Sequence, residues 1–300
     1  MRTAVSHNVK VYGFRRGYEG LLSSDLMEMN NKSVSDIIYK GGTMLLTARC
    51  MEMMTPEGQE KAANVCKVLG LDALIVIGGD GSLHGGLRLS ERGVNVIGMA
   101  GTIDLDLACT DYTIGFDTAV NTVMDAITKI RDTSTSHERC SVVEVMGRNA
   151  GYIALWCGIT GGAEEVLVPE DLSVDAHAVI EQIMKNRSGG KTHNLIIVAE
   201  GRGGKGKTEE FAREIEKLTG IETRATILGH LQRGGSPTAL DRMHAAIMGN
   251  LAVETVLKGE TNKMIIFKNG KYDAMDLAEA LKVTREYDPH YYNVMKVLSV

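Results

Sequence analysis

Residues 73–82 read Ala73-Leu-Ile-Val-Ile-Gly-Gly-Asp-Gly-Ser82, which places a buried strand directly before a glycine-rich turn and a helix. Consecutive glycines let backbone N–H groups face an anion, and the N-terminus of the following helix adds a favourable dipole. Asp80 can hold Mg²⁺, directly or through water. The alternative is that Asp80 and Ser82 only cap the helix. No Gly-Lys-Ser/Thr follows, so the turn is not a Walker loop.

The same strand-then-helix order recurs along the chain. Short apolar runs without polar alternation are typical of parallel strands buried on both faces. We expect such strands at Val9–Phe14, Ala73–Ile77, Val94–Ala100, Cys140–Met146, Glu165–Val168, Asn194–Ala199, Thr223–Leu228 and Met264–Phe267. Helical periodicity predicts helices at Pro56–Leu69, Thr118–Arg131, Val174–Lys185, Glu209–Leu218 and Ala239–Leu257. This order predicts an α/β architecture with parallel sheets.

The composition narrows the class of protein. A net charge of −5 and 44% hydrophobic residues argue against disorder and against nucleic acid as the main partner. No apolar run reaches the length of a membrane span, and the first residues lack the apolar core of a signal peptide. The cysteines form no CxxC pair, so we expect reduced, mostly buried thiols of a cytosolic protein and no zinc site. They are Cys50, Cys66, Cys109, Cys140 and Cys157.

Polar residues gather where other strands end, and ligands of open α/β sheets bind there. Asp104 and Asp106 follow the run Val94–Ala100 and suit a general base and a carboxylate near a metal, although turns are often rich in Asp. Arg139 and Arg148 flank the next run. The fork of donors on an arginine matches phosphate oxygens, and surface salt bridging is the alternative.

A last polar segment spans residues 222–237. Arg224 lies early in a strand, and His230 and Arg233 lie past its end, before the flexible turn Gly234-Gly235. A lone histidine is usually structural, whereas a histidine between two arginines beside such a turn favours an anion pocket. Metal-capable aspartates, a base and several arginines at strand ends fit phosphoryl transfer, without naming the acceptor.

Four segments, in order and with nearly constant spacing over almost the whole chain, resemble signature segments of the bacterial ATP-dependent 6-phosphofructokinase family. They are Gly78-Gly79-Asp80-Gly81-Ser82, Gly101-Thr-Ile-Asp-Leu-Asp106, Ser141-Val-Val-Glu-Val-Met-Gly-Arg148 and Gly229-His-Leu-Gln-Arg-Gly-Gly-Ser-Pro237. The resemblance implies transfer of the γ-phosphate of ATP to the 1-hydroxyl of fructose 6-phosphate, giving fructose 1,6-bisphosphate, with Mg²⁺ as cofactor. It also implies a cytoplasmic glycolytic enzyme.

The resemblance implies two Rossmann-like three-layer α/β domains with mostly parallel sheets and the active site in the cleft between them. We expect a larger nucleotide domain at residues 1–115 and about 232–278. The smaller sugar-phosphate domain is expected at about 116–231 and 279–300, with a final helix after Ala278. The family is typically a homotetramer whose active sites are shared between subunits.

Family roles carry over residue by residue. Asp104 is implied to be the general base, Asp80 and Asp106 to serve Mg²⁺, and Thr102 to contact the reacting end of the sugar. Arg49 and Arg148 are implied to stabilise charge on the transferred phosphoryl group. The implied sugar-phosphate residues are Arg139, Met146, Gly147, Arg148, Glu200, Arg224, His230 and Arg233, with Arg139 and Arg224 reaching the 6-phosphate from a neighbouring subunit. The implied nucleotide residues are Tyr18, Arg49, Gly79, Asp80, Gly81, Ser82 and Gly85.

Two further features follow from the resemblance. Gly81 and Gly101 are small where pyrophosphate-using relatives carry Asp and Lys, which favours ATP as donor. An allosteric site for ADP and phosphoenolpyruvate is implied in part, at Arg2, Arg131, Glu164 and Lys191.

The chain departs from the family at two places. Leu105 stands where the family usually has Asn. The chain begins inside the family's first helix, so we expect roughly twenty residues, a strand and a glycine-rich ATP turn, to be absent. The alternative hypothesis is therefore a catalytically impaired or regulatory subunit. A third hypothesis, a kinase acting on NAD or a lipid, is disfavoured by the segment from His230 to Arg233.

Overall fold

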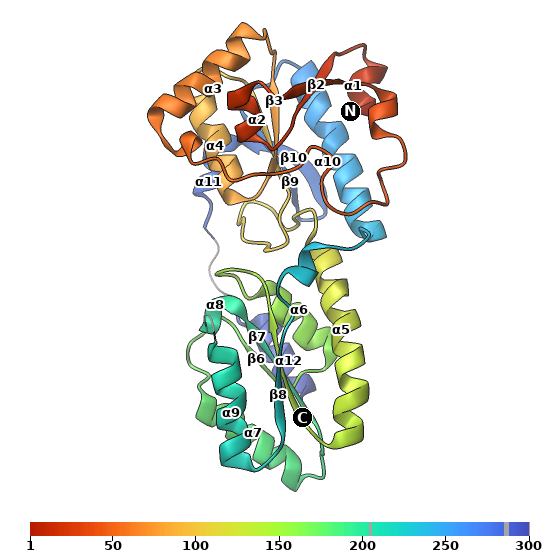
Figure 1. Ribbon diagram of the computed structural model, residues 1–300, viewed down its shortest axis with the longest axis vertical. Coiled ribbons are helices and arrows are strands. Elements are labelled where there is room, and N and C mark those ends of the chain that lie inside the picture. Colours follow the sequence, from red (N-terminus) through yellow and green to blue (C-terminus); the bar gives the residue numbers. More distant parts are fainter. Residues whose placement is uncertain (204–205, 285–287, 300) are drawn as a thin grey trace. The chain divides into compact units, whose positions relative to one another are not determined.

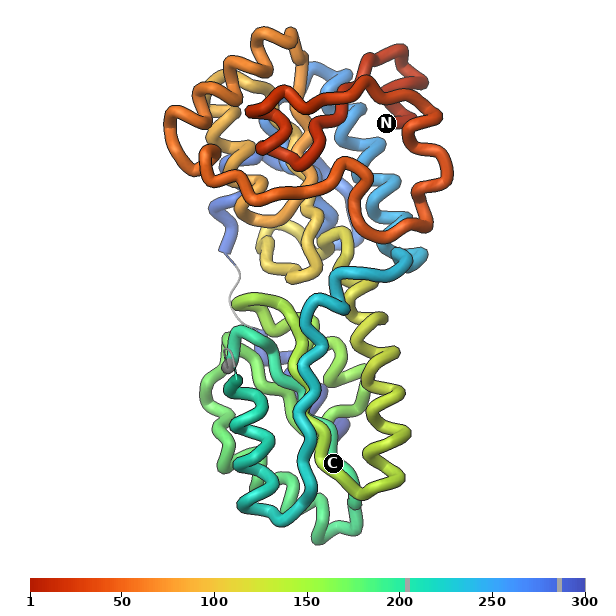
Figure 2. Tube along the Cα trace, in the orientation of Figure 1, coloured from red at the N-terminus to blue at the C-terminus, as the bar shows by residue number. Residues whose placement is uncertain are grey.

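The computed structural model describes residues 1–203, 206–284 and 288–299, and the chain divides into two compact units (Figure 1). Unit 1 comprises Met1–Thr102, Leu107–Gly115 and Gly235–Thr284. Unit 2 comprises Ile103–Asp106, Phe116–Gly234 and the described part of Arg285–Val300. The colours of Figure 2 let the reader follow the chain from its N-terminus to its C-terminus. The longest segment of unit 2, Phe116–Gly234, lies between two segments of unit 1.

Unit 1 is built on a sheet with the strand order β10-β9-β4-β3. The strands are β3 (Leu74–Gly78), β4 (Val96–Ala100), β9 (Lys263–Lys268) and β10 (Lys271–Asp276). β3, β4 and β9 run parallel, and β10 joins β9 as an antiparallel hairpin. Because β3 and β4 are parallel neighbours, the turns that follow them lie at the same edge of the sheet.

Helices cover both faces of this sheet, and successive β4 side chains point to opposite faces. Ile97 and Met99 pack in one cluster with residues of α10. Val96 and Ala100 belong to the other cluster, with residues of α3, α4 and α11. The helices are α3 (Pro56–Val68), α4 (Asp80–Ser90), α10 (Ala239–Leu257) and α11 (Leu277–Lys282).

Unit 2 is a three-layer arrangement around a fully parallel sheet with the order β6-β7-β5-β8. Val143 and Val145 of β5 pack towards α5, α6 and α12, while Cys140 and Val142 pack towards α7 and α9. The strands are β5 (Cys140–Val145), β6 (Glu165–Leu167), β7 (Asn194–Ala199) and β8 (Thr223–Ile227). The helices are α5 (Phe116–His137), α6 (Tyr152–Gly161), α7 (Ala176–Ser188), α9 (Lys207–Thr219) and α12 (His290–Leu298). The predicted α/β fold with parallel sheets is confirmed.

Two sequence predictions were wrong at the margins of unit 1. The run Val9–Phe14 does not form a buried parallel strand: β1 (Val11–Phe14) pairs antiparallel with β2 (Leu26–Met29), and Tyr12 is exposed. β3 is not buried on both faces: Ile75 and Ile77, which point to the same face, are 39% and 64% exposed, whereas Val76 on the other face is buried. The remaining elements are α1 (Arg2–Ser6), α2 (Tyr18–Ser23), η1 (Asn31–Val34), η2 (Glu52–Met54), α8 (Glu200–Gly203) and η3 (Gly229–Arg233).

The cysteines are free thiols, and all except Cys50 are buried. Burial raises the pKa of Cys140 and of Cys157 to about 12, and it also raises the pKa of Cys66. Among the described residues, no helix combines the length and the apolar character that crossing a membrane requires.

A buried carboxylate anchors α12 to the unit 2 sheet. Glu165 at the start of β6 is 2% exposed. Its Oε1 accepts a hydrogen bond from the Tyr292 hydroxyl at 2.9 Å, and its Oε2 lies 2.9 Å from Nζ of Lys296. Both partners lie on α12, so one carboxylate stabilises the docking of the whole helix.

Glu165→Ala should lower the free energy of unfolding by about 1–3 kcal/mol, because it leaves a half-buried hydroxyl and a half-buried ammonium group without their acceptor. Urea unfolding followed by circular dichroism measures the change. Glu214→Ala, on an exposed face of α9, is the matched control and should shift stability little. Equal effects of the two substitutions would contradict the anchoring role.

Candidate functional site

The glycine turn after β3 and the residues after β4 lie side by side in unit 1. The amide of Gly101 donates to the carbonyl of Gly78 at 2.9 Å. A Cβ atom at Gly79 would lie 3.5 Å from the Cβ of Thr102. The predicted nucleotide turn and the predicted catalytic residue Thr102 are therefore neighbours, as the parallel pairing of their strands requires.

Asp80 is the first residue of α4, and its carboxylate is half exposed. Nδ1 of His84 lies 3.1 Å from Oδ1 of Asp80. Gly81 faces open space, because a Cβ atom there would meet no heavy atom within 4 Å. The turn thus combines an accessible carboxylate, free volume and the amide groups of a helix N-terminus, which together can hold a phosphate chain and a hard cation.

Tyr18 contacts the residues that follow the turn. Its hydroxyl donates to the carbonyl of Ser82 at 2.6 Å, and burial raises the pKa of this phenol. A Cβ atom at Gly85 would lie 2.7 Å from the Tyr18 ring, so only glycine permits this approach. Tyr18 therefore fixes the first turns of α4.

The centre of the candidate site in unit 2 is a buried aspartate beside two arginines. Asp104 is 1% exposed, and its Oδ2 lies 3.3 Å from Nε of Arg148. Its Oδ1 lies 3.8 Å from Nη2 of Arg233. Arg148 follows β5 and Arg233 ends η3, which follows β8. Since β5 and β8 are parallel neighbours, the two arginines reach the same carboxylate.

The backbone before Arg148 is held by a second carboxylate. Arg148 has a φ of 53°, which is rare for a residue with a side chain. Oε1 of Glu200 accepts the amides of Gly147 at 3.3 Å and of Arg148 at 2.8 Å. A Cβ atom at Gly201 would lie 2.0 Å from the carbonyl oxygen of Arg148. Glu200 and Gly201 therefore keep Arg148 in this conformation.

Gln232 is a site residue that the sequence did not single out. It is 1% exposed, its Nε2 donates to the carbonyl of Gly229 at 3.0 Å, and its Oε1 accepts the amide of Met146 at 3.0 Å. It thus ties η3, which carries His230 and Arg233, to the end of β5. The sequence could have indicated Gln232, because it lies in the same motif as His230 and Arg233.

Arg139 and Arg224 come together around one glutamate. Nε of Arg139 lies 2.7 Å from Oε2 of Glu222, and Nη2 of Arg224 lies 2.6 Å from Oε1. Hydrogen bonds from Arg139 and then from Arg224 lower the pKa of the Glu222 carboxyl. The two arginines and Lys129 line a cavity of about 280 Å³. Three cations around a small hollow suit an anionic group.

The other predicted residues are dispersed. Arg49 is exposed in a part of unit 1 without regular structure, and Asp106 is exposed after Leu105. Of the predicted allosteric set, Lys191 and Glu164 form an ion pair of 2.6 Å in unit 2, and Nη2 of Arg131 donates to the carbonyl of Gly162 at 2.5 Å. The fourth member, Arg2, lies in α1 of unit 1.

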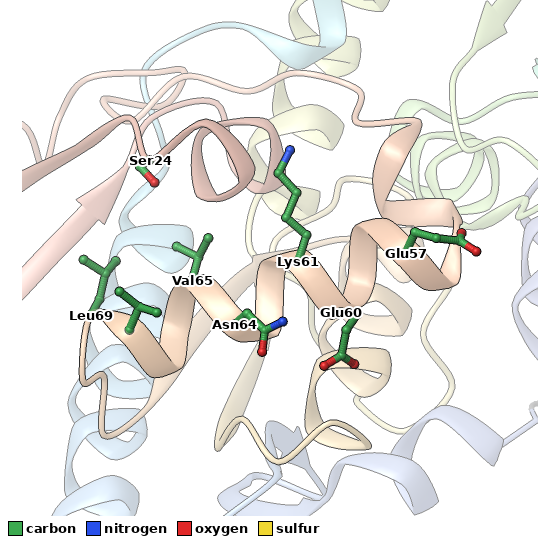
Figure 3. Close-up of a pocket in the computed structure, with 8 residues that line it drawn as sticks. Ser24, Glu57, Glu60, Lys61, Asn64, Val65 and Leu69 are labelled. Atoms are coloured by element: carbon green, nitrogen blue, oxygen red, sulfur yellow. The ribbon is translucent and has the colours of Figure 1, made fainter.

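A larger hollow lies along α3 (Figure 3). Its volume is about 630 Å³. The residues that line it are Ser24, Glu57, Glu60, Lys61, Asn64, Val65, Val68 and Leu69. None of these residues belongs to the predicted site, so the volume of this hollow does not identify it as the catalytic site.

Comparison with known sequences gives consistent matches. The family model described as phosphofructokinase matches residues 1–256. A Clostridium botulinum protein named ATP-dependent 6-phosphofructokinase is 54% identical over 299 residues, which are 100% of this chain and 92% of that protein. ATP-dependent 6-phosphofructokinase 1 of Clostridium perfringens is 54% identical over 298 residues, 99% of this chain and 92% of that protein.

Solved structures share the fold. Phosphofructokinase from Saccharomyces cerevisiae superposes with a TM-score of 0.86 at 33% identity, over 99% of this chain and 44% of that chain. A pyrophosphate-dependent phosphofructokinase from Marinobacter aquaeolei gives a TM-score of 0.84 at 21% identity, over 97% of this chain and 80% of that chain. The second likeness concerns the fold alone.

Gly201→Ala should lower the free energy of unfolding by about 1–3 kcal/mol, because the added methyl group cannot fit against the Arg148 carbonyl without moving the backbone. Thermal or urea unfolding measures the loss. Gly249→Ala is the control: a Cβ atom there meets nothing within 4 Å, and alanine is a better helix former. An unchanged stability of Gly201→Ala would show that the contact is not constraining.

Proposed function

The chain belongs to the phosphofructokinase family, and we propose that it transfers the γ-phosphate of ATP to the 1-hydroxyl of fructose 6-phosphate, giving fructose 1,6-bisphosphate in glycolysis. The observation that supports this chemistry best is the buried Asp104 carboxylate beside Arg148 and Arg233. Phosphoryl transfer needs a base for the attacking hydroxyl and cations for the charge that develops on the phosphate.

Asp104 takes the proton of the sugar 1-hydroxyl as the new O–P bond forms and the bond between the γ-phosphorus and the bridging oxygen of ATP breaks, with ADP as the leaving group. Arg148 stabilises the charge on the transferred phosphoryl group, and its position 3.3 Å from the Asp104 carboxylate supports this role beside the base. Thr102 contacts the transferred phosphate, and Arg49 adds a second positive charge. His230, Arg233 and the turn of Met146 and Gly147 hold the sugar phosphate.

The residues present fit the Mg²⁺ that the reaction requires. Mg²⁺ typically takes only one or two protein carboxylates and completes its shell with phosphate oxygens and water. The half-exposed carboxylate of Asp80, at the start of α4, is such a donor, and Asp106 is a second exposed one. When bound, the ion neutralises negative charge on the phosphates of ATP.

ATP is the phosphoryl donor. The open space at Gly81 leaves room for the nucleotide, whereas a side chain at this position would extend into that space. The amides of Asp80 and Gly81, at the N-terminus of α4, are the donors for the phosphate chain, because the amide of Ser82 already donates to the carbonyl of Gly79. Tyr18 and Gly85 serve the nucleotide by holding that helix in place.

The chain acts as a homotetramer with shared active sites. Arg139 and Arg224 reach the 6-phosphate of a sugar bound by a neighbouring subunit, and the small cationic cavity beside them supports this assignment. The pair Lys191 and Glu164, with Arg131, belongs to an effector site for ADP or phosphoenolpyruvate. The free thiols fit a cytoplasmic location.

Asp104→Asn should lower kcat on the order of a thousandfold, because an amide cannot take the proton of the hydroxyl. A coupled assay with ATP, Mg²⁺ and fructose 6-phosphate measures it, and unfolding curves establish that the variant is folded. Asp72→Asn, at an exposed position of unit 1, is the matched control and should behave as the wild type.

A wild-type chain that binds fructose 6-phosphate but gives no product would favour the regulatory alternative. Turnover that survives in Asp104→Asn would mean that another group removes the proton. Either result would overturn part of the proposed mechanism.

Glu222→Gln should lower the KM for fructose 6-phosphate roughly two- to fivefold, because it releases Arg139 and Arg224 from an exposed ion pair of modest strength. Since the pKa of Glu222 is lowered, the carboxylate is ionised throughout the near-neutral range, and the ratio between variant and wild type should stay constant from about pH 6 to about pH 8. Glu216→Gln, exposed on α9, is the control. A raised KM would instead show that Glu222 holds the arginines in their working positions.

A further inference from the structure

Leu105, between the two aspartates, combines two features that rarely occur together. Its φ is 53°, in the left-handed region that branched apolar residues seldom adopt. Its side chain is only 6% exposed and belongs to the buried apolar cluster of unit 2, with Ile103, Phe116 and Met146. Leu105 therefore has an unfavourable backbone conformation and a side chain that is packed in the core.

The surrounding segment shows what this burial achieves. Residues Ile103–Asp106 belong to unit 2, although Thr102 and Leu107 on either side of them belong to unit 1. Ile103 and Leu105 are the apolar members of this short segment, and both are buried in the unit 2 cluster. They are the groups that attach the segment to unit 2 by packing.

The conformation of Leu105 also separates the two carboxylates. With φ at 53°, the chain turns sharply between Asp104, which is 1% exposed, and Asp106, which is exposed. An extended or right-handed helical Leu105 would aim the preceding peptide differently and would displace Asp104 from Arg148 and Arg233. The geometry of the base thus depends on a backbone state that leucine by itself disfavours.

We propose that Leu105 is a positioning residue for Asp104: burial of its side chain in the core of unit 2 holds the left-handed turn that places the carboxylate beside Arg148 and Arg233. The inference rests on the proposed function, in which Asp104 is the base. Leu105 touches no reacting atom in this scheme and acts only through the backbone.

Two apolar substitutions separate positioning from packing. Leu105→Val keeps an apolar side chain, but a β-branched residue is strongly disfavoured in the left-handed region. Leu105→Met keeps the burial without adding a branch at Cβ. We expect kcat to fall at least about tenfold in the valine variant and to stay within about twofold of the wild type in the methionine variant, as the sensitivity of catalysis to small displacements implies.

The split between kinetic constants identifies the cause. Because Leu105 acts on the base and not on substrate contacts, the KM for ATP and the Kd for fructose 6-phosphate, measured by calorimetry, should change less than about twofold in both variants. Val123→Ala, a truncation in the same buried cluster on α5, is the control for lost packing and should lower the unfolding temperature while leaving kcat unchanged below it.

The outcomes are distinct. A kcat loss in Leu105→Val with substrate binding retained, together with an active Leu105→Met, supports the proposal. Equal kcat in both variants, or an equal loss in Val123→Ala, overturns it while leaving the proposed function intact if Asp104→Asn remains inactive. A wild-type chain without turnover overturns the proposed function and this inference together. Should Leu105→Val fail to fold, Leu105→Ala replaces it: alanine removes the packing and does not itself favour the left-handed turn, and undiminished kcat in that variant also overturns the proposal.

Discussion

The buried carboxylate of Asp104 is the constraint on which the arrangement of the site in unit 2 depends. Burying Asp104 is costly unless cations lie close to it, and two guanidinium groups do so, at 3.3 and 3.8 Å. Arg148 and Arg233 can both reach it only because β5 and β8 are parallel neighbours whose ends deliver both segments to one place. Gln232 and Glu200 then fix the backbone of these segments by hydrogen bonds to main-chain groups. The strand order, the turn conformation and the hydrogen bonds of Gln232 and Glu200 therefore all help to hold two cations beside the Asp104 carboxylate.

The parts of the fold that could be predicted are those where burial dominates. β4 and β7 are apolar on both faces and were expected from their sequences. β2 (Leu26–Met29) and β10 (Lys271–Asp276) were not expected, because each is an antiparallel strand that is largely open to solvent and mixes charged with apolar residues. β3 was expected, but the exposure of the face that carries Ile75 and Ile77 was not, because an apolar strand does not show in its own sequence which of its faces a helix will cover.

Some residues of the candidate site could likewise be predicted from the sequence, and others could not. Asp104, Arg148 and Arg233 could be found because functional groups gather at the ends of strands, and the motif fixes which residues those are. The roles of Glu222 and Gly201 could not be found, since they arise from contacts between segments that are distant in sequence. Nothing in the sequence around Glu222 shows that its carboxylate pairs with both Arg139 and Arg224. Nothing around Gly201 shows that its backbone lies against the carbonyl of Arg148.

Because each unit contains two buried cysteines, the rate at which their thiols react reports local opening of that unit. Unit 1 buries Cys66 and Cys109, and unit 2 buries Cys140 and Cys157. An alkylating reagent attacks the thiolate, so burial protects these sulfurs both by exclusion and, for Cys140 and Cys157, through a pKa raised to about 12. Each sulfur regains ordinary reactivity only when its surroundings open. The order in which mass spectrometry finds the four peptides labelled therefore gives separate opening rates for the two halves of the molecule, without any engineered probe.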